Sequence, residues 1–416
     1  MGASSSTGTT DEDLRLLKTK PAHARERQQA FERLRQKFLT PIGKAELLKA
    51  TAQVEALRFP LWQEPPPDAT HLDAEVLADR VRGALFGAAL GDAAGLATEF
   101  LSAAQAKEFY GSEADFRPGR AVFPDEHRMM WCPGDWTDDT DQQVLMMRSL
   151  LQSAGRADAC DFGSRLLSWR TSGFPELGDQ SAAGLGQTTK AVLNDPNFAT
   201  SPHTAAAAHS ASIPSNGGVM RTAVAGVPHF WCEETVAANA RELCLVTHAE
   251  PRCVASCVVV AICISRLLRG EDTEDLMQSA VQPALVRAQE FLGDAGRQEM
   301  YRHAEASRLQ DLALDDQKTI GFTFKCLGAG IWALKQDGSR PRGPGGLLFR
   351  NVLNELILAG GDADTNGAVA GALLGCRLGF SQLPSEWIAG MPYSSWLEAY
   401  VQKVLFMIRQ RPSVQS

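Results

Sequence analysis

Two segments far apart in the chain share one glycine spacing: RGALFGAALGDAAG at residues 82–95 and GDADTNGAVAGALLGCRLG at residues 361–379. Glycine recurs at every fourth position from Gly83 to Gly95 and again from Gly367 to Gly379. Residues four apart share one face of an α-helix, so each segment presents a stripe without side chains. A glycine inside a helix costs about 0.5–1 kcal/mol relative to alanine, and close approach of a second backbone offsets that cost. The pattern predicts two core helices that cross closely.

The chain from Ala78 onward is mostly helical in pattern. Segments rich in Ala, Leu, Met and Gln recur, alternating β-branched runs are scarce, and no fixed repeat indicates a solenoid. The sequence therefore predicts one compact all-α domain over residues 78–410, followed by a tail at 411–416. Connectors rich in polar residues, Gly and Pro are expected at 111–136 and 195–218. Helices are expected near residues 79–95, 139–153, 158–171, 235–247, 251–268, 278–292, 318–335, 345–358 and 365–379.

Residues 1–77 differ in composition from the rest and are interpreted as a polar, basic N-terminal extension. Its first 13 residues are rich in Ser, Thr and Gly, which is typical of disorder, and residues 21–39 fit a basic amphipathic helix. A proline run at 65–67 suggests a stiff linker. We expect the helical part to pack on the domain, with docking to a membrane or partner as the alternative. Gly2 and Ser6 also fit a loose myristoylation pattern, and whether it is used stays open.

Composition excludes several classes of protein. The net charge of -8 over 416 residues argues against general nucleic-acid binding, which needs a basic face. The longest charge-free apolar stretch, Cys253–Ser265, is shorter than the roughly 20 residues that cross a bilayer, and no N-terminal apolar signal is seen. Nine cysteines without a repeated spacing indicate reduced thiols rather than a disulfide framework or zinc site. We expect a soluble cytoplasmic protein.

Acidic residues gather where helices are expected to begin. Thr137, Asp138 and Asp139 precede one helix, and the motif from Asp362 to Thr365, which includes Asp364, opens the second glycine segment. Helix capping explains a single Asp or Thr at such a place, but adjacent carboxylates held inward would repel each other. Carboxylate and hydroxyl oxygens suit Mg²⁺ or Mn²⁺ rather than zinc. Four aspartates would balance the charge of two divalent ions, a known catalytic arrangement.

A third pattern is the turn Ser215, Asn216, Gly217 and Gly218, which precedes a helix-like run containing Met220-Arg221. Backbone N–H groups in such a turn can bind phosphate, and an ordinary capped turn is the alternative. His248 follows Thr247 at the start of another helix, and taken alone it is more often structural than functional.

These motifs, in this order, resemble those of the ADP-ribosylglycohydrolase family. The matching stretches are residues 82–92 with Glu99, 136–140, 215–217 with Met220-Arg221, 247–248 and 361–367, and the resemblance covers roughly residues 78–380. It implies an all-α orthogonal bundle with a binuclear Mg²⁺ site in a central cleft, where Mn²⁺ would substitute. The resemblance implies metal ligation by Thr137, Asp138, Asp139, Asp362, Asp364 and Thr365.

The resemblance also implies roles for other residues. Glu99 matches the family's acid near the scissile bond, and Glu99, Asp138 and Asp364 are the candidate catalytic carboxylates. Diphosphate or substrate contacts are implied for Ser215, Asn216, Gly217, Gly218 and His248. One departure is Pro214, which removes an N–H donor from the phosphate-binding turn and leaves the identity of the substrate open.

The implied activity is a Mg²⁺-dependent hydrolysis of the glycosidic bond at the distal ribose of an ADP-ribosylated protein or small molecule, releasing ADP-ribose. Two alternatives stay open: a catalytically silent member that binds ADP-ribose or is structural, and a hydrolase of another N- or O-glycoside. The acceptor, the general base and the oligomeric state are not decided by the sequence.

Overall fold

The computed structural model describes residues 12–17, 24–59, 62–272, 275–336 and 346–409. These residues form helices and no strands, which confirms the all-α prediction, and only two isolated β-bridges occur among them, Ser102–Gly360 and Ser215–Phe322. The principal helices are α2 (Ala24–Phe38), α3 (Lys44–Ala56), α4 (Ala74–Gly95), α5 (Ala103–Tyr110), α6 (Asp138–Gln152), α7 (Ala159–Ser172), α8 (Gln187–Leu193), α9 (Pro202–Ser210), α10 (Glu233–Cys244), α11 (Pro251–Leu268), α12 (Gln282–Ala288), α13 (Asp294–Ala304), α14 (Thr323–Lys335), α15 (Leu347–Leu358), α16 (Ala363–Leu378), α17 (Ser385–Gly390) and α18 (Ser394–Met407).

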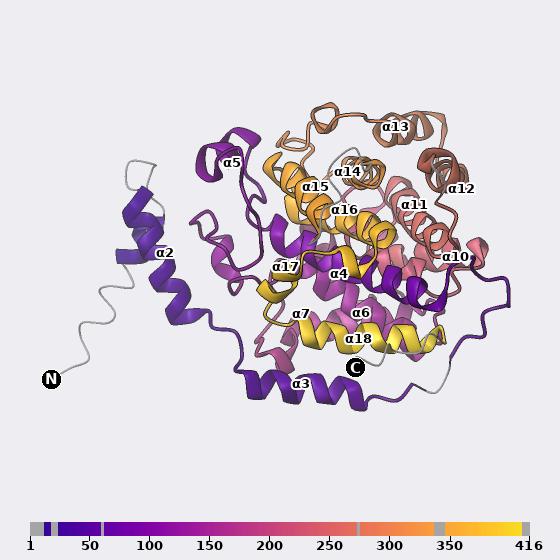
Figure 1. Ribbon diagram of the computed structural model, residues 1–416, viewed down its shortest axis with the longest axis horizontal. Helices are drawn as coiled ribbons and strands as arrows, with labels where there is room; N and C mark the ends of the chain where they lie inside the picture. The colour runs from indigo at the N-terminus through magenta and orange to yellow at the C-terminus, as the bar shows by residue number, and fades with distance from the viewer. Residues whose placement is uncertain (1–11, 18–23, 60–61, 273–274, 337–345, 410–416) are drawn as a thin grey trace.

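Helices α4 and α16 cross at the centre of the bundle (Figure 1). A Cβ atom added to Gly87 would lie 2.1 Å from the carbonyl oxygen of Gly371, and one added to Gly91 would lie 1.9 Å from that of Gly367. The glycines therefore let the two backbones touch, which confirms the predicted close crossing. Because Gly83 meets Gly375 while Gly95 meets Ala363, the two helices run antiparallel.

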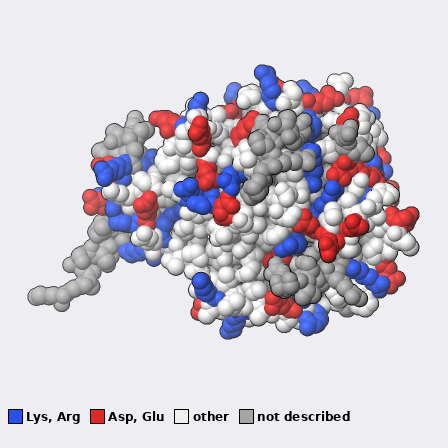
Figure 2. Space-filling model, viewed as in Figure 1, with Lys and Arg blue, Asp and Glu red and all other residues white. Residues whose placement is uncertain are grey.

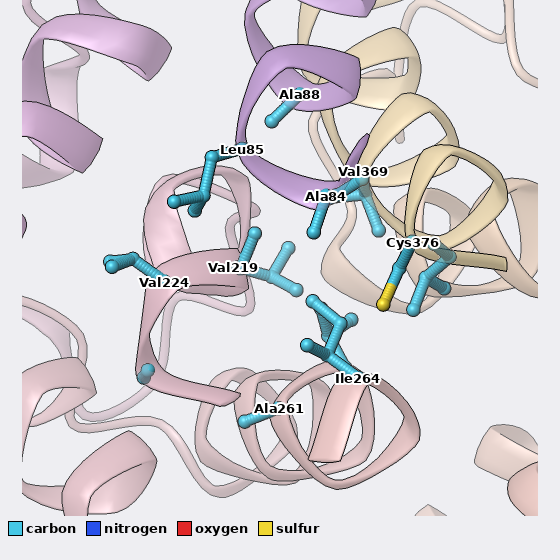
Figure 3. Close-up of a cluster of buried hydrophobic side chains, with 14 of the residues drawn as sticks. Ala84, Leu85, Ala88, Val219, Val224, Ala261, Ile264, Val369 and Cys376 are labelled. Carbon is cyan, nitrogen blue, oxygen red and sulfur yellow. The ribbon is translucent and has the colours of Figure 1, made fainter. Parts of the chain in front are cut away.

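Small and β-branched side chains fill the space beneath this crossing. Figure 3 shows Ala84 and Val369 from the two crossing helices facing Ala261 and Ile264 of α11, all of them buried. Among the described residues, α11 is the one helix long and apolar enough to cross a membrane, and most of it is buried inside the protein. Its apolar composition is therefore that of a core helix.

Three differences from the expected elements have local causes. The helix expected from residue 318 begins only at Thr323, because residues up to Phe322 pair with the turn around Ser215. The helix expected at 278–292 is divided into a π-turn at Met277–Val281, α12 and a 3₁₀ turn at Gln289–Phe291; Pro283 in the first turn of α12 lacks the N–H that a continuous helix needs. The connector expected at 195–218 contains α9.

In the described part of the N-terminal segment, helices α2 and α3 precede α4, and residues 12–17 are also helical. Helix α3 lies along α18 (Figure 1), and its Ala50 and Val54 are buried in the main hydrophobic core. Helix α2 lies at the edge of the molecule. On the face drawn in Figure 2, acidic and basic side chains are interspersed. Helix α4 begins at Ala74, four residues before the expected boundary, and the pattern at Gly2 lies outside the described residues.

Candidate active site

The crossing brings the C-terminal end of α4 to the N-terminal end of α16. A Cβ atom on Gly95 would lie 2.2 Å from the carbonyl oxygen of Ala363 and 2.4 Å from the Cα atom of Asp364. The acidic motif that opens α16 therefore lies directly against the segment that leads from α4 to Glu99. Two motifs distant in sequence become neighbours because no side chain separates the helices.

The carboxylate of Asp92 ties the start of α6 to α4. It accepts hydrogen bonds from the backbone N–H groups of Thr137 (3.0 Å) and Thr140 (2.9 Å) and from the Thr140 hydroxyl (2.6 Å). Burial raises the pKa of Asp92 to about 6, although these hydrogen bonds lower it. Thr137 is the N-cap of α6. Asp138 and Asp139, which follow in the first turn, are thereby fixed next to α16.

Three carboxylates from separate segments form a compact group. Oxygen atoms of Glu99, Asp362 and Asp364 lie within 4.8 Å of one another, close enough to share a metal ion. The Thr137 hydroxyl donates to Asp364 at 3.4 Å, and the side-chain amide of Asn216 donates to Asp362 at 2.8 Å. The sequence placed Glu99 apart from the presumed metal ligands, whereas the structure brings it into their group.

The electrostatics of this group call for positive charge or protons. Burial, together with neighbouring negative charges, raises the pKa values of Asp138, Asp139 and Asp364 well above the usual range. Hydrogen bonding by Thr365 partly offsets the rise for Asp139 and Asp362. Among the described residues no hydrogen-bond donor pairs with Asp139 Oδ2 or Asp364 Oδ1, although both atoms are buried. Such oxygens need a positive ligand or protons.

Glu99 lies on a turn that pairs with the residues before α16. The Phe100 N–H donates to the Gly361 carbonyl at 2.6 Å, and the Gly361 N–H donates back to the Leu101 carbonyl at 2.8 Å. Phe100 has a φ of 61°, a left-handed conformation that non-glycine residues seldom adopt. Gly360 and Gly361 also have positive φ. This pairing holds Glu99 beside Asp362.

Two residues that the sequence analysis did not select hold Glu99 from the other side. His127 Nε2 lies 2.5 Å from Glu99 Oε2. The buried guanidinium of Arg128 donates to the backbone carbonyls of Ala97 (3.0 Å) and Glu99 (2.5 Å). Both residues lie in the segment expected to be a polar connector, and nothing in its local pattern links it to Glu99.

The turn that begins at Ser215 lies next to the carboxylates. The Asn216 N–H donates to the Gly321 carbonyl at 3.0 Å, while its side chain reaches Asp362 as described above. The Ser215 hydroxyl donates to Thr188 at 3.1 Å. A Cβ atom on Gly217 would lie 2.9 Å from His248 Nε2, and one on Gly218 would lie 3.5 Å from His248 Cβ. The structure thus gathers all five residues selected for substrate binding.

An all-α bundle with a buried carboxylate centre and an adjoining glycine turn defines the class of protein. The family model for ADP-ribosylglycohydrolase matches residues 73–414, and the chain belongs to the ADP-ribosylglycohydrolase family. Members of this family are hydrolases of ADP-ribosyl linkages, and so is this protein.

Relatives named for this activity are similar to the chain over most of their length. The ADP-ribosylarginine hydrolase Tri1 of Serratia proteamaculans is 25% identical over 359 residues, which cover 84% of each chain. The ADP-ribosyl-[dinitrogen reductase] glycohydrolase of Rhodospirillum rubrum is 26% identical, covering 75% of this chain and 90% of the relative. A solved structure described as an ADP-ribosylglycohydrolase-related protein complex is 26% identical in sequence and has a TM-score of 0.56. The alignment covers 80% of this chain and 99% of the chain in that structure.

Proposed function

We propose that this protein is a Mg²⁺-dependent hydrolase that cleaves the glycosidic bond at the distal ribose of an ADP-ribosylated protein or small molecule and releases ADP-ribose. The observation that carries the proposal is the convergence of Glu99 with Asp362 and Asp364 in a chain of this family. The names of the relatives supply two starting substrates, ADP-ribosylated arginine and an ADP-ribosylated protein.

The carboxylate centre fits hard divalent cations. Its donors are all oxygen atoms, and two of these, on Asp139 and Asp364, are buried without a partner among the described residues. When bound there, Mg²⁺ would polarise ribose hydroxyls and lower the pKa of a water molecule. The residues that would hold two such ions, with Mn²⁺ as a substitute, are Thr137, Asp138, Asp139, Asp362, Asp364 and Thr365, with Glu99 adjoining them.

The protein's own groups would perform the remaining chemistry. Cleavage at C1″ develops positive charge on the ribose ring, which a nearby carboxylate stabilises. Glu99 is the residue that we assign to this position, where it would also accept a proton from the attacking water. His127 orients the Glu99 carboxylate. Asp138 and Asp364 are the other candidate catalytic carboxylates.

The glycine turn would bind the diphosphate. Within the described part of the chain, no acceptor pairs with the backbone N–H groups of Gly217 and Gly218. Free N–H groups at such a turn are suited to phosphate oxygens. Asn216 connects the turn to Asp362, so a diphosphate bound there would place the distal ribose toward the carboxylates.

A substrate panel tests the activity. The protein would be incubated with Mg²⁺ or a chelator and with arginine-, serine- and nucleic-acid-linked ADP-ribose, and free ADP-ribose measured. We expect Mg²⁺-dependent release from at least one substrate.

Glu99→Gln should lower turnover by about 10²–10⁴-fold and change ADP-ribose affinity far less. Asp294→Asn, at an exposed carboxylate, is the control. Equal turnover of Glu99→Gln and wild type would remove Glu99 from the reaction, and ADP-ribose bound by both without release from any substrate would favour a binding protein.

Thermal unfolding tests the metal separately. A ligand that binds only the folded state stabilises it by about 2.7 kcal/mol at a hundred times its dissociation constant. Mg²⁺ or Mn²⁺ should therefore raise the melting temperature of chelator-treated protein, and Asp362→Ala should abolish the increase. An unchanged wild-type melting curve contradicts the metal assignment.

A further inference from the structure

Arg221, from the Met220-Arg221 motif, has an unusual environment. It is fully buried, and within the described part of the chain no carboxylate forms an ion pair with it. Its guanidinium donates to Gln142 Oε1 at 2.5 Å, to the Thr247 hydroxyl at 2.6 Å and to the Leu243 carbonyl at 3.5 Å. Burying a charge without an opposite charge in contact is costly. The residue therefore calls for a role beyond packing.

The guanidinium restricts the direction of the neighbouring hydrogen bonds, because it can act only as a donor. Arginine can only donate, so Gln142 must present its oxygen to Arg221 and its nitrogen to Asp138, whose Oδ2 lies 2.8 Å away. Thr247 likewise uses its oxygen to accept from Arg221. Its oxygen has a second lone pair, but among the described residues His248 Nδ1, at 2.7 Å, is the one acceptor that the hydroxyl proton contacts, so we assign the proton to that nitrogen.

This direction determines the tautomer of His248. With Nδ1 assigned as the acceptor from Thr247, the ring proton is on Nε2. Burial and the positive charge of Arg221 lower the pKa of His248 to about 3, so the ring is neutral. Among the described residues Nε2 has no partner, although it is buried. The Cβ position of Gly217 lies 2.9 Å from it, so the unpaired N–H faces the glycine turn.

We propose that Arg221 and Thr247 are positioning residues that hold His248 as a neutral donor, with its Nε2–H directed at an oxygen of the bound ADP-ribosyl group beside Gly217. The proposal rests on the proposed function for the identity of that ligand. In this proposal the Thr247 hydroxyl and the Arg221 guanidinium act together to keep the proton of His248 on Nε2, the ring nitrogen that faces the ligand.

Two paired substitutions at residue 247 test the proposal on the full chain. Thr247→Val removes the hydroxyl, whereas Thr247→Ser retains it. Thr51→Val removes a hydroxyl remote from the site, one that lies 3.4 Å from Ser395. Nitrogen-15 NMR of histidine-labelled protein, with His248→Asn to assign the signal, reports which ring nitrogen carries the proton. Isothermal calorimetry with ADP-ribose in the presence of Mg²⁺ reports binding.

We expect Nε2–H in wild type, Thr51→Val and Thr247→Ser, and a mixture of tautomers in Thr247→Val. Loss of one oriented hydrogen bond should weaken ADP-ribose binding of Thr247→Val about three- to tenfold, with Thr247→Ser near wild type. Arg221→Lys, which keeps the charge but loses the fork, should also give mixed tautomers. If Arg221→Lys does not fold, the pair at residue 247 remains decisive.

Two results overturn the proposal. One is a proton on Nδ1 in the wild type, and the other is unchanged ADP-ribose affinity in Thr247→Val. Failure of the proposed function looks different, because the wild type would then release no ADP-ribose from any substrate, whatever the tautomer of His248.

Discussion

The two sides of the site are held in different ways. On the aspartate side (Asp138, Asp139, Asp362 and Asp364), each carboxylate lies at or beside the start of a helix, and those helices are fixed by the α4–α16 crossing and by Asp92. On the other side is the Glu99 turn, residues 97–102, which is held by its pairing with Gly361 and by side chains of the preceding connector.

Because of this difference, substitutions on the two sides should affect different properties, stability on one side and turnover on the other. Positions on the aspartate side depend on backbones that touch, so a change there should disturb the whole fold. The Glu99 turn depends on a few polar contacts, so a change at the partly exposed His127 should alter turnover and leave the fold intact. The predictions below test that separation, beginning with the largest effect.

Gly91→Ala should have the largest effect on stability. The added Cβ atom would stand 1.9 Å from the carbonyl oxygen of Gly367, and neither backbone can move without disrupting the crossing. Overpacking in a core costs about 1–3 kcal/mol and occasionally more, and we expect the upper end or complete failure to fold. Circular dichroism and thermal unfolding measure the loss.

The matched control is Gly293→Ala, because a Cβ atom there meets nothing within 4 Å and the residue has a φ of -72°. Gly293 is the N-cap of α13, where Ala is less favourable than Gly, so this variant should fold and lose at most about 1 kcal/mol. Equal melting temperatures for the two variants would show that the crossing tolerates side chains and that glycine spacing does not fix the aspartate side.

The aspartate side could be predicted from the sequence because its determinants are local. The four-residue glycine spacing directly encodes a stripe on a helix face, and the structure confirms the contact that this stripe predicts. Asp and Thr before a helix encode a capped start. The roles of these residues as metal ligands stay a prediction. That the two acidic segments lie close together could be expected from two short motifs.

The contacts of the Glu99 turn could not be predicted. His127 lies 28 positions from Glu99 in a segment without helical or strand periodicity, so no sequence pattern links the two residues. Arg128 donates to backbone carbonyls, which every residue has, so the sequence does not indicate which of them it binds. Thr247 and Arg221 were selected only as parts of motifs, because the direction of a hydrogen bond appears only once donors and acceptors are placed.

His127→Ala should have an intermediate effect, confined to turnover. The side chain is about a quarter exposed, so its loss should cost little stability. Losing a hydrogen bond that orients Glu99 should lower kcat about tenfold, equivalent to about 1.4 kcal/mol. Steady-state kinetics on the best substrate of the panel would measure it. The Mg²⁺-induced rise in melting temperature should persist, since the aspartate side is untouched.

His209→Ala provides the control for this prediction, because His209 Nε2 lies 2.9 Å from Asp195 Oδ2 in a similar but exposed pair. Its turnover should equal that of wild type. If His127→Ala retains full turnover, the short contact to Glu99 has no part in the reaction.

The connector that carries His127 is itself supported by α2. Phe31 and Leu34 of this helix are buried against Val122 and Met129. Arg27 donates to the Pro124 carbonyl at 2.6 Å, and Arg35 donates to the Trp131 carbonyl at 3.0 Å. These contacts flank His127 on both sides, although α2 precedes residue 73, where the family match begins.

Phe31→Ala should therefore have the smallest effect of the three. Phe31 is 1% exposed, but its cluster is separate from the main core, so loss of its packing should loosen α2 without unfolding the bundle. We expect faster amide hydrogen exchange at residues 121–131 and a two- to threefold fall in turnover, about 0.4–0.7 kcal/mol. The main melting transition should stay in place. Leu48→Ala, at a side chain 69% exposed on α3, should change none of these. Unchanged exchange at 121–131 would mean that the connector holds His127 without help from α2, and that the support for the Glu99 turn ends within the part of the chain that the family model covers.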